Sequence, residues 1–149
     1  MNTSQYDRQQ WISVMAKAPA KTLIALSDSL VKTHPFETIR APEIGLTQVQ
    51  ARMGGTGKPF NLGDTPLTRC VVRTPDGIYG YSYIAGRNKA HALRAAELDA
   101  LLQLEAYHAQ ITEAVLIPLK AEQDAHRQQK ITQTSKTRVD FFTLVRGED

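Results

Sequence analysis

Glycine and proline are concentrated in the middle of this chain, and that uneven distribution limits the folds it can adopt. Eight of the nine glycines lie between Gly45 and Gly86, and five of the seven prolines lie between Pro35 and Pro75. Both residue types interrupt helices and favour strands joined by turns. The distribution therefore predicts a central β region, with the helices confined to the two flanking regions.

Four strands are expected in the central region, at residues 36–40, 46–53, 67–74 and 78–85. The last two are separated by Pro75, Asp76 and Gly77, and an Asp-Gly pair is a strong signal for a tight hairpin turn. We therefore expect these two strands to pair in antiparallel fashion.

The flanking regions have the apolar spacing of helices. One helix is expected at residues 4–17, and a second begins at Pro19 and ends at the His34-Pro35 pair. A long helix is expected at residues 88–111, where Asn88 can accept hydrogen bonds from the first turn. Residues 119–130 also have a helical composition.

The C-terminal region is expected to contain a loop at residues 132–137 and a final strand at residues 138–145. Strand alternation would place Val139, Phe141 and Val145 on one face and Phe142 and Leu144 on the other. Two apolar faces need cover on both sides, from this chain or from a partner. Phe142 and Leu144 are therefore candidate interface residues.

These elements predict an α+β fold in a single domain over residues 1–149. Its mostly antiparallel sheet would carry helices packed on one face. The single cysteine, Cys70, excludes an internal disulfide. The polar N-terminus and the absence of a long apolar run predict a cytoplasmic protein without a membrane segment.

The excess positive charge is local. The formal net charge is +3, and residues 40–73 contain five basic residues (Arg40, Arg52, Lys58, Arg69 and Arg73) against Glu43 and Asp64. Such a patch favours an anionic small ligand or an acidic partner surface. Nucleic acid is not expected as a partner, because its binding more often requires a stronger and wider basic surface. The isoelectric point near 9.1 is the one feature that favours it.

A glycine-rich segment, Arg52-Met53-Gly54-Gly55-Thr56-Gly57-Lys58, lies inside this basic region. It is not a Walker A loop, because Arg52 and Pro59 replace required residues, and the dinucleotide-binding motif also fails. Its glycines would still let backbone N–H groups approach an anion between Arg52 and Lys58. A flexible turn that only connects two strands is an equally good interpretation.

The segment Gly86-Arg87-Asn88-Lys89-Ala90-His91 is a second candidate for anion binding. It connects a strand to a helix, and unpaired helix N–H groups attract anions there, with Arg87 and Lys89 adding charge. His91 is a weak candidate for proton transfer. A capped helix start with solvated side chains is equally compatible, and no histidine spacing suggests a metal site.

Tyrosine recurs at every second position in Tyr79, Tyr81 and Tyr83. A strand would direct all three rings to one face and leave small residues such as Gly80 and Ser82 on the other. Such a row of rings suits a protein interface, although a half-buried sheet face is an equally good alternative.

Several motifs together resemble the PhnG family of the phosphonate carbon–phosphorus lyase system. The similarity is strongest through residues 43–101 and covers nearly the whole chain. The family departs from this chain at Asn88 and Cys70, where Asp and Ala are more often expected. The motifs are Glu43-Ile44-Gly45-Leu46, Gln50-Ala51-Arg52-Met53-Gly54-Gly55-Thr56-Gly57, Asp76-Gly77, Gly80-Tyr81-Ser82, Gly86-Arg87, His91-Ala92, Asp99-Ala100-Leu101 and Val139-Asp140-Phe141-Phe142-Thr143.

The resemblance implies a function that composition does not reveal. PhnG acts with PhnH, PhnI and PhnL to make α-D-ribose 1-methylphosphonate 5-triphosphate from ATP and methylphosphonate, with release of adenine. It also belongs to a core complex with PhnH, PhnI and PhnJ, in which PhnJ carries an iron–sulfur cluster, and PhnK is a possible further partner. No cofactor is expected in this chain itself.

Two hypotheses follow. In the first, the chain is a subunit that is not active alone, in which Arg52, Gly54, Gly55, Gly57, Lys58, Arg69, Arg87 and Lys89 meet an anion or a partner. In the second, it is a stand-alone phosphate-ester or nucleotide-processing enzyme, with Arg52, Lys58 and Arg69 holding phosphate.

Overall fold

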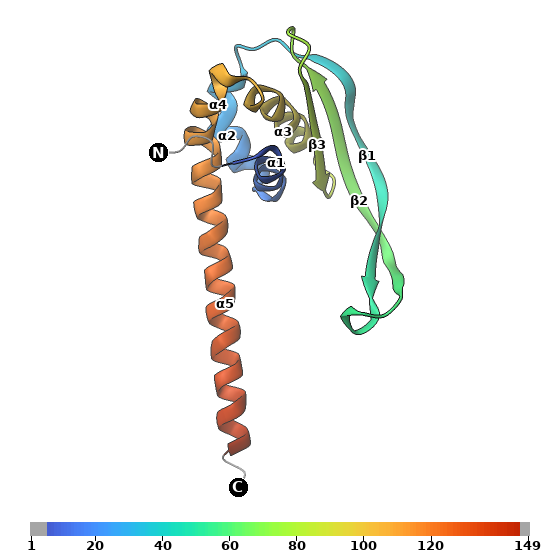
Figure 1. Ribbon diagram of the computed structural model, residues 1–149, viewed down its shortest axis with the longest axis vertical. Coiled ribbons are helices and arrows are strands. Elements are labelled where there is room, and N and C mark those ends of the chain that lie inside the picture. The colour runs from blue at the N-terminus through green and yellow to red at the C-terminus, as the bar shows by residue number, and fades with distance from the viewer. Residues whose placement is uncertain (1–5, 147–149) are drawn as a thin grey trace.

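The computed structural model describes residues 6–146 of the chain, and the side chains of Met53 and of residues 137–146 lie outside the description. The sheet contains three antiparallel strands in the order β1-β2-β3, and helices cover one face of it (Figure 1). This arrangement confirms the predicted α+β fold. The helices and strands are α1 (Arg8–Lys17), α2 (Ala20–Val31), β1 (Glu37–Arg52), β2 (Pro59–Arg73), β3 (Tyr79–Ala85), α3 (Lys89–Leu102), α4 (Glu105–Ile111) and α5 (Ile117–Arg146).

Two short elements complete the chain path. The 3₁₀ turn η1 (Met53–Gly55) connects β1 to β2, and the π-helical turn η2 (Thr112–Leu116) leads from α4 into α5. Among the described residues, no helix is long and apolar enough to cross a membrane.

The predicted hairpin at Asp76-Gly77 is confirmed. Gly77 takes a φ of 88°, which residues with side chains rarely adopt, and its N–H donates to the Thr74 carbonyl at 2.9 Å. The Thr74 N–H donates to the Ile78 carbonyl at 2.9 Å, which sets the register of β2 against β3. Pairing then continues to Leu67 opposite Ala85.

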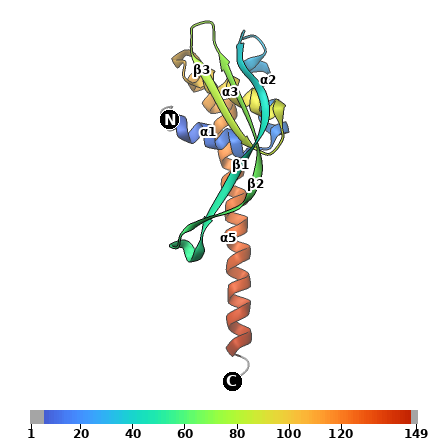
Figure 2. The ribbon, with the colours of Figure 1, turned by 90° about the vertical axis from the view of Figure 1, so that its right-hand side faces the viewer.

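The first two strands are much longer than expected. The predicted strands at 36–40 and 46–53 form one continuous strand, β1, and β2 begins at Pro59 rather than at residue 67. Because β3 pairs only with residues 67–73 of β2, the distal part of the β1–β2 hairpin has no third strand. We call residues 44–66 the ribbon. It extends beyond the body in the same direction as α5 (Figures 1 and 2).

The core lies between the sheet and α3, with α1, α2 and η2 closing the other sides. Helix α3 is buried along most of its circumference, and its neighbour β3 approaches it closely because Gly80 has no side chain. Fully buried side chains include Met15, Leu23, Val72, Leu98, Leu101, Ile111, Val115 and Leu116.

The expected helix at residues 88–111 is interrupted. Leu104 has an extended backbone, with φ −91° and ψ 123°, and separates α3 from α4. The His108 ring donates from Nδ1 to the Leu102 carbonyl at 2.9 Å, so a carbonyl at the end of α3 is satisfied by the following helix. No glycine or proline marks this break, so the sequence pattern did not indicate it.

The predicted loop at 132–137 and final strand at 138–145 are wrong, because both segments lie in α5. Between Pro118 and Gly147 the sequence contains no glycine or proline that would stop a helix. Once a helix has formed, each added residue contributes a hydrogen bond, and the β-branched residues of this segment oppose that only weakly.

Candidate functional site

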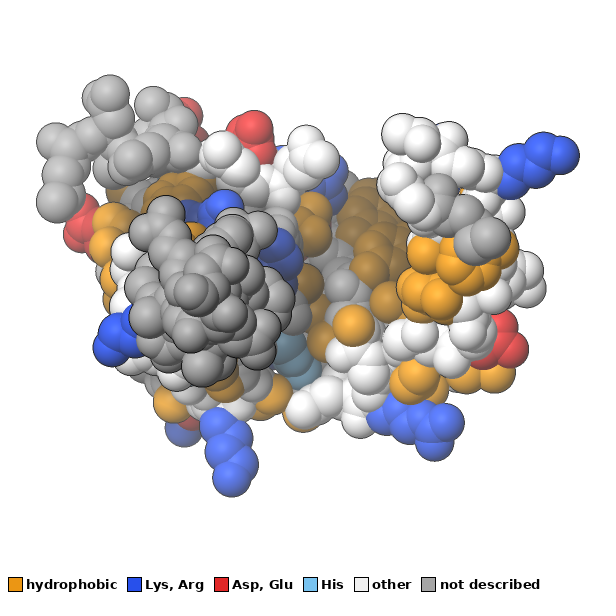
Figure 3. All heavy atoms as spheres, turned by 90° about the horizontal axis from the view of Figure 1, so that it is seen from below, with side chains coloured by type: hydrophobic (Ala, Val, Ile, Leu, Met, Phe, Trp, Pro, Cys, Tyr) orange, Lys and Arg blue, Asp and Glu red, His pale blue; other side chains and the backbone are white. Residues whose placement is uncertain are grey.

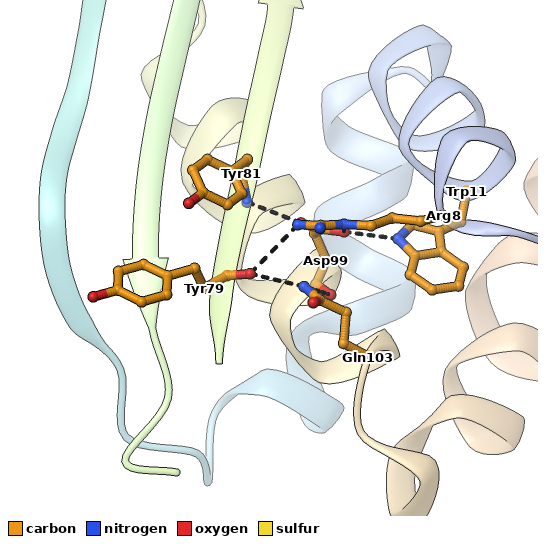
Figure 4. A network of polar contacts seen from close by, with 6 residues as sticks. All are labelled: Arg8, Trp11, Tyr79, Tyr81, Asp99 and Gln103. Atoms are coloured by element: carbon orange, nitrogen blue, oxygen red, sulfur yellow. Dashed lines mark hydrogen bonds and ion pairs between the residues drawn. The ribbon is translucent and has the colours of Figure 1, made fainter. Parts of the chain in front are cut away.

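A buried carboxylate, Asp99 on α3, connects this helix to α1 and to β3, the strand that carries the three tyrosines (Figure 4). Its side chain is fully buried and accepts hydrogen bonds from Trp11 Nε1 at 2.8 Å and from the Tyr81 N–H at 2.9 Å. Arg8 Nη2 contacts it at 2.9 Å. That hydrogen bond raises the pKa of Arg8, against the opposing effect of burial. Asp99 on α3 therefore fixes α1 and β3 in place.

The same junction satisfies the first carbonyl of β3. Gln103 Nε2 donates to the Tyr79 carbonyl at 2.7 Å, and Arg8 Nη2 lies 3.5 Å from the same oxygen. The sequence motif containing Asp99 indicated the family but not this role. A single acidic residue between Leu98 and Ala100 in a helix with apolar neighbours was the available signal.

The three tyrosines share one face of the sheet, as predicted, and this face is the outer one. Tyr79, Tyr81 and Tyr83 are 40%, 39% and 56% exposed, while Gly80 and Ser82 between them are buried. The rings of Tyr79 and Tyr81 stack with centroids 6.4 Å apart. This outer tyrosine face borders a shallow groove of about 360 Å³ to which Ile39, Arg40, Arg69 and Val71 also contribute.

Arg69 is separate from the other predicted anion-binding residues. It lies on the outer face and donates to Glu43 Oε1 at 2.6 Å, and Arg40 contacts the same oxygen at 3.1 Å. The hydrogen bond from Arg69 is the main cause that lowers the pKa of Glu43. Arg73 pairs in the same way with Glu37. The arginines of this face are therefore largely neutralised by the chain's own carboxylates.

The glycine-rich segment forms the end of the ribbon, and we call residues 53–58 the tip loop. Gly54 and Gly55 take φ angles of 61° and 81°, which explains why glycine occupies both positions. Arg52, Gly54, Gly55 and Lys58 are exposed, and Gly57 is partly exposed. Nothing lies within 4 Å of the positions that a Cβ would take at Gly54 and Gly55.

The segment containing Arg87 and Lys89 lies at the base of the ribbon. The Gly86 N–H donates to the Pro66 carbonyl at 2.8 Å, and Pro66 pairs with Leu46. Arg52 lies six positions after Leu46, which corresponds to about 20 Å of strand. The structure therefore does not bring the two predicted anion-binding segments together in one chain.

At that base, backbone N–H groups in the first turn of α3 have hydrogen-bond acceptors. The Asn88 side chain accepts from the His91 N–H at 3.0 Å, as predicted for a cap. His91 itself is only 5% exposed, and its Nε2 lies 2.8 Å from the Met15 carbonyl. Because a carbonyl can only accept, Nε2 carries the proton. This geometry gives His91 a structural contact between α1 and α3.

Two further predictions concern metals and the C-terminal region. Among the described residues, no three His, Cys, Asp or Glu side chains are grouped so that they could hold a metal ion. Phe142 and Leu144 lie on α5, so the argument for a strand with two apolar faces no longer applies. Their side chains lie outside the described residues, and their contact with a partner stays a prediction.

Comparison with known proteins agrees with the earlier resemblance. Residues 6–147 match the family described as phosphonate metabolism protein PhnG. A relative from Rhizobium meliloti (strain 1021) is 39% identical over 142 residues, covering 95% of this chain and 90% of the relative. That relative is named α-D-ribose 1-methylphosphonate 5-triphosphate synthase subunit PhnG. The chain belongs to the PhnG family of phosphonate metabolism proteins.

Proposed function

We propose that this chain is a subunit of an α-D-ribose 1-methylphosphonate 5-triphosphate synthase and is not active alone. The name of its relative and the family match support the activity. In this proposal the complex transfers the ribose triphosphate moiety of ATP to methylphosphonate and releases adenine. The companion chains are of the PhnH, PhnI and PhnL types.

The same chain would also join a core complex with PhnH, PhnI and PhnJ, with PhnK as a possible further partner. An iron–sulfur cluster is expected on the PhnJ-type chain and not on this one. Because the reaction consumes ATP, the assembly is expected to work in the cytoplasm.

The exposed ribbon is the observation on which the subunit role depends. Isolated two-stranded hairpins are at best marginally stable in water. This ribbon also exposes five large apolar side chains, namely Ile44 (43%), Leu46 (67%), Val49 (38%), Phe60 (41%) and Leu62 (63%). Burying the exposed half of each would contribute about 1 kcal/mol, or on the order of 5 kcal/mol in total.

Part of this apolar surface continues the core face of the sheet. Ile44 lies opposite Thr68, which is fully buried, and Leu46 lies two residues further on the same face. Seen from below, hydrophobic side chains line the side of the ribbon toward a hollow between ribbon and helices (Figure 3). A companion subunit that filled this hollow would bury the apolar side chains.

The projecting part of α5 points to the same conclusion. From residue 121 to 130 the helix is predominantly polar, and most of its residues are exposed. Gln123 donates to the Val14 carbonyl at 2.9 Å, but a helical segment without an apolar stripe receives little tertiary stabilisation. The segment is therefore well suited to become ordered against another chain.

The buried polar side chains that the structure describes already have hydrogen-bond partners. Asp99 binds Arg8 and Trp11, His91 contacts the Met15 carbonyl, and Arg94 contacts Ser27 Oγ at 3.0 Å. These contacts support a role in which this chain supplies surfaces to the assembly rather than the central chemistry.

Co-expression with the companion subunits tests the proposal. We expect a stable complex that converts ATP and methylphosphonate, whereas the chain purified alone should not. A chain that remains separate from its companions, or that carries out the whole conversion unaided, would refute the subunit role and would favour the stand-alone enzyme.

A further inference from the structure

The tip loop is held far from the rest of its own chain. The paired strands of the ribbon carry it about 20 Å beyond the level of Gly86, where β3 has ended. No other element reaches the loop in Figures 1 and 2. Any ligand that contacts it must therefore be held mainly by another molecule.

The charges at the tip differ from those elsewhere on the sheet. Arg40, Arg69 and Arg73 each contact a glutamate of the same chain. Arg52 and Lys58 have no such partner among the side chains that the structure describes, and the only acidic residue of the ribbon is Asp64, opposite Gln48. Arg52 lies four positions after Gln48, or about 13 Å along the strand. Two positive charges thus remain unneutralised at the tip.

The tip loop itself has little to offer a protein surface. Interfaces depend on bulky side chains that fill pockets, whereas Gly54, Gly55 and Gly57 leave only Thr56 between Met53 and Lys58. Glycine turns instead allow backbone N–H groups to surround an anion closely. Guanidinium groups bind phosphate oxygens in pairs, and an ammonium adds a point charge. The apolar side chains that suit docking lie further back on the ribbon.

We propose that the tip loop, with Arg52 and Lys58, binds the triphosphate group of a nucleotide substrate or sugar product seated on a companion subunit. The ribbon docks through its apolar side chains and delivers the loop to that site. This inference rests on the proposed function, which supplies the triphosphate. It explains why the chain carries an anion-binding loop without a pocket of its own around it.

The test uses the assembled synthase with Arg52→Ala, Lys58→Ala and the double variant. Complex mass is measured by native mass spectrometry, and the KM for ATP and the inhibition constant of tripolyphosphate are measured in turnover assays. Hydrogen bonds to charged groups of this kind correspond to about tenfold in affinity each. We therefore expect both constants to rise about tenfold for each single variant and roughly a hundredfold for the double variant, with assembly unchanged.

Two further variants test whether the effect depends on the paired donors of Arg52 and on the position of the charge. Arg52→Lys keeps the charge but not the paired donors, so it should recover part of the affinity. Lys21→Ala combined with Lys32→Ala removes the same charge from exposed positions in and next to α2, and should leave both constants unchanged. A rise confined to the KM for ATP, without a matching rise for tripolyphosphate, would mean that the loop reads another part of the nucleotide and would overturn the proposal.

Two other outcomes also decide the matter. Assembled variants with unchanged constants would refute triphosphate binding, and loss of assembly in parallel with activity would show that the tip is a docking contact to an acidic partner. If the wild-type chain itself fails to assemble, the proposed function is refuted, and the loop proposal falls with it.

Discussion

Substituting Gly80 by alanine should be among the most damaging single changes in the chain. A Cβ at this position would lie 2.0 Å from the Ala96 carbonyl oxygen and 2.8 Å from the Ala100 backbone nitrogen. Ordinary contact begins near 3.4 Å, so β3 and α3 must separate by about 1.4 Å. Both obstacles are backbone atoms of a buried helix and cannot rotate away.

The separation would also disturb the hydrogen bonds beside Gly80. The Tyr81 N–H contacts Asp99 at 2.9 Å and Gln103 contacts the Tyr79 carbonyl at 2.7 Å, and a shift of this size breaks or strains both. Overpacking costs about 1–3 kcal/mol and an unsatisfied buried acceptor a similar amount. The sum is about 4 kcal/mol, or a fall in Tm of roughly 8–16 °C for a chain of this size.

Urea and thermal denaturation of Gly80→Ala, followed by circular dichroism, would measure this effect. Gly45→Ala is the matched control, because Gly45 lies in the same sheet, has no positive φ and has nothing within 4 Å of its Cβ position. The control should stay within about 0.5 kcal/mol of the wild type. A Gly80→Ala protein with that same small change would refute the close packing of β3 on α3.

Four other predictions test separate features. Asp99→Ala should lower the free energy of unfolding by about 3 kcal/mol in urea titrations, because it leaves the buried Trp11 and Tyr81 donors without an acceptor; wild-type stability would contradict this. Burial raises the pKa of Cys70 to about 11, so a thiol reagent at pH 8 should modify it only after unfolding, and rapid reaction of the folded chain would argue against the core placement. Burial also raises the pKa of Glu97 above its usual 4.5, so the wild type should lose stability as pH rises through that raised value. Glu97→Gln should remove this loss and should be more stable than the wild type at pH 7. Identical profiles of stability against pH for the two proteins would disprove the raised pKa. Leu46→Gln with Leu62→Gln should weaken assembly in pull-down assays without lowering the stability of the isolated chain, since both residues are exposed there, whereas undiminished assembly would exclude the ribbon as a docking surface.

Elements specified by neighbouring residues were predictable from the sequence. The Asp76-Gly77 turn, the one-sided tyrosine row and the Asn88 cap each depend on contacts within a few positions along the chain. The family resemblance likewise rested on local motifs and is confirmed.

Features that depend on distant parts of the chain were not predictable in the same way. Arg69 resembled a free phosphate ligand until its pairing with Glu43, 26 residues earlier, was visible. His91 resembled a surface proton donor because the sequence does not show that α1 covers it. The final segment alternates like a strand, yet nothing in it stops the helix that enters from Leu116.

The ribbon was missed for a simpler reason. Its residues alternate as strand residues do, and alternation does not show whether a third strand lies alongside. In the structure a β3 of 7 residues accompanies only part of a β2 of 15 residues. The strands expected from the sequence at 67–74 and 78–85 have equal lengths, so they gave no sign of an unaccompanied hairpin.

The hydrogen bonds around Asp99 also determine which edge of the sheet can pair with a strand of another molecule. β3 is an edge strand, and the free polar groups of such edges invite intermolecular pairing that leads to aggregation. Here the Tyr81 N–H is occupied by a carboxylate and the Tyr79 carbonyl by Gln103. An incoming strand would have to displace these side chains first, so the first half of β3 is closed to sheet extension, and β1 forms the other edge of the described sheet.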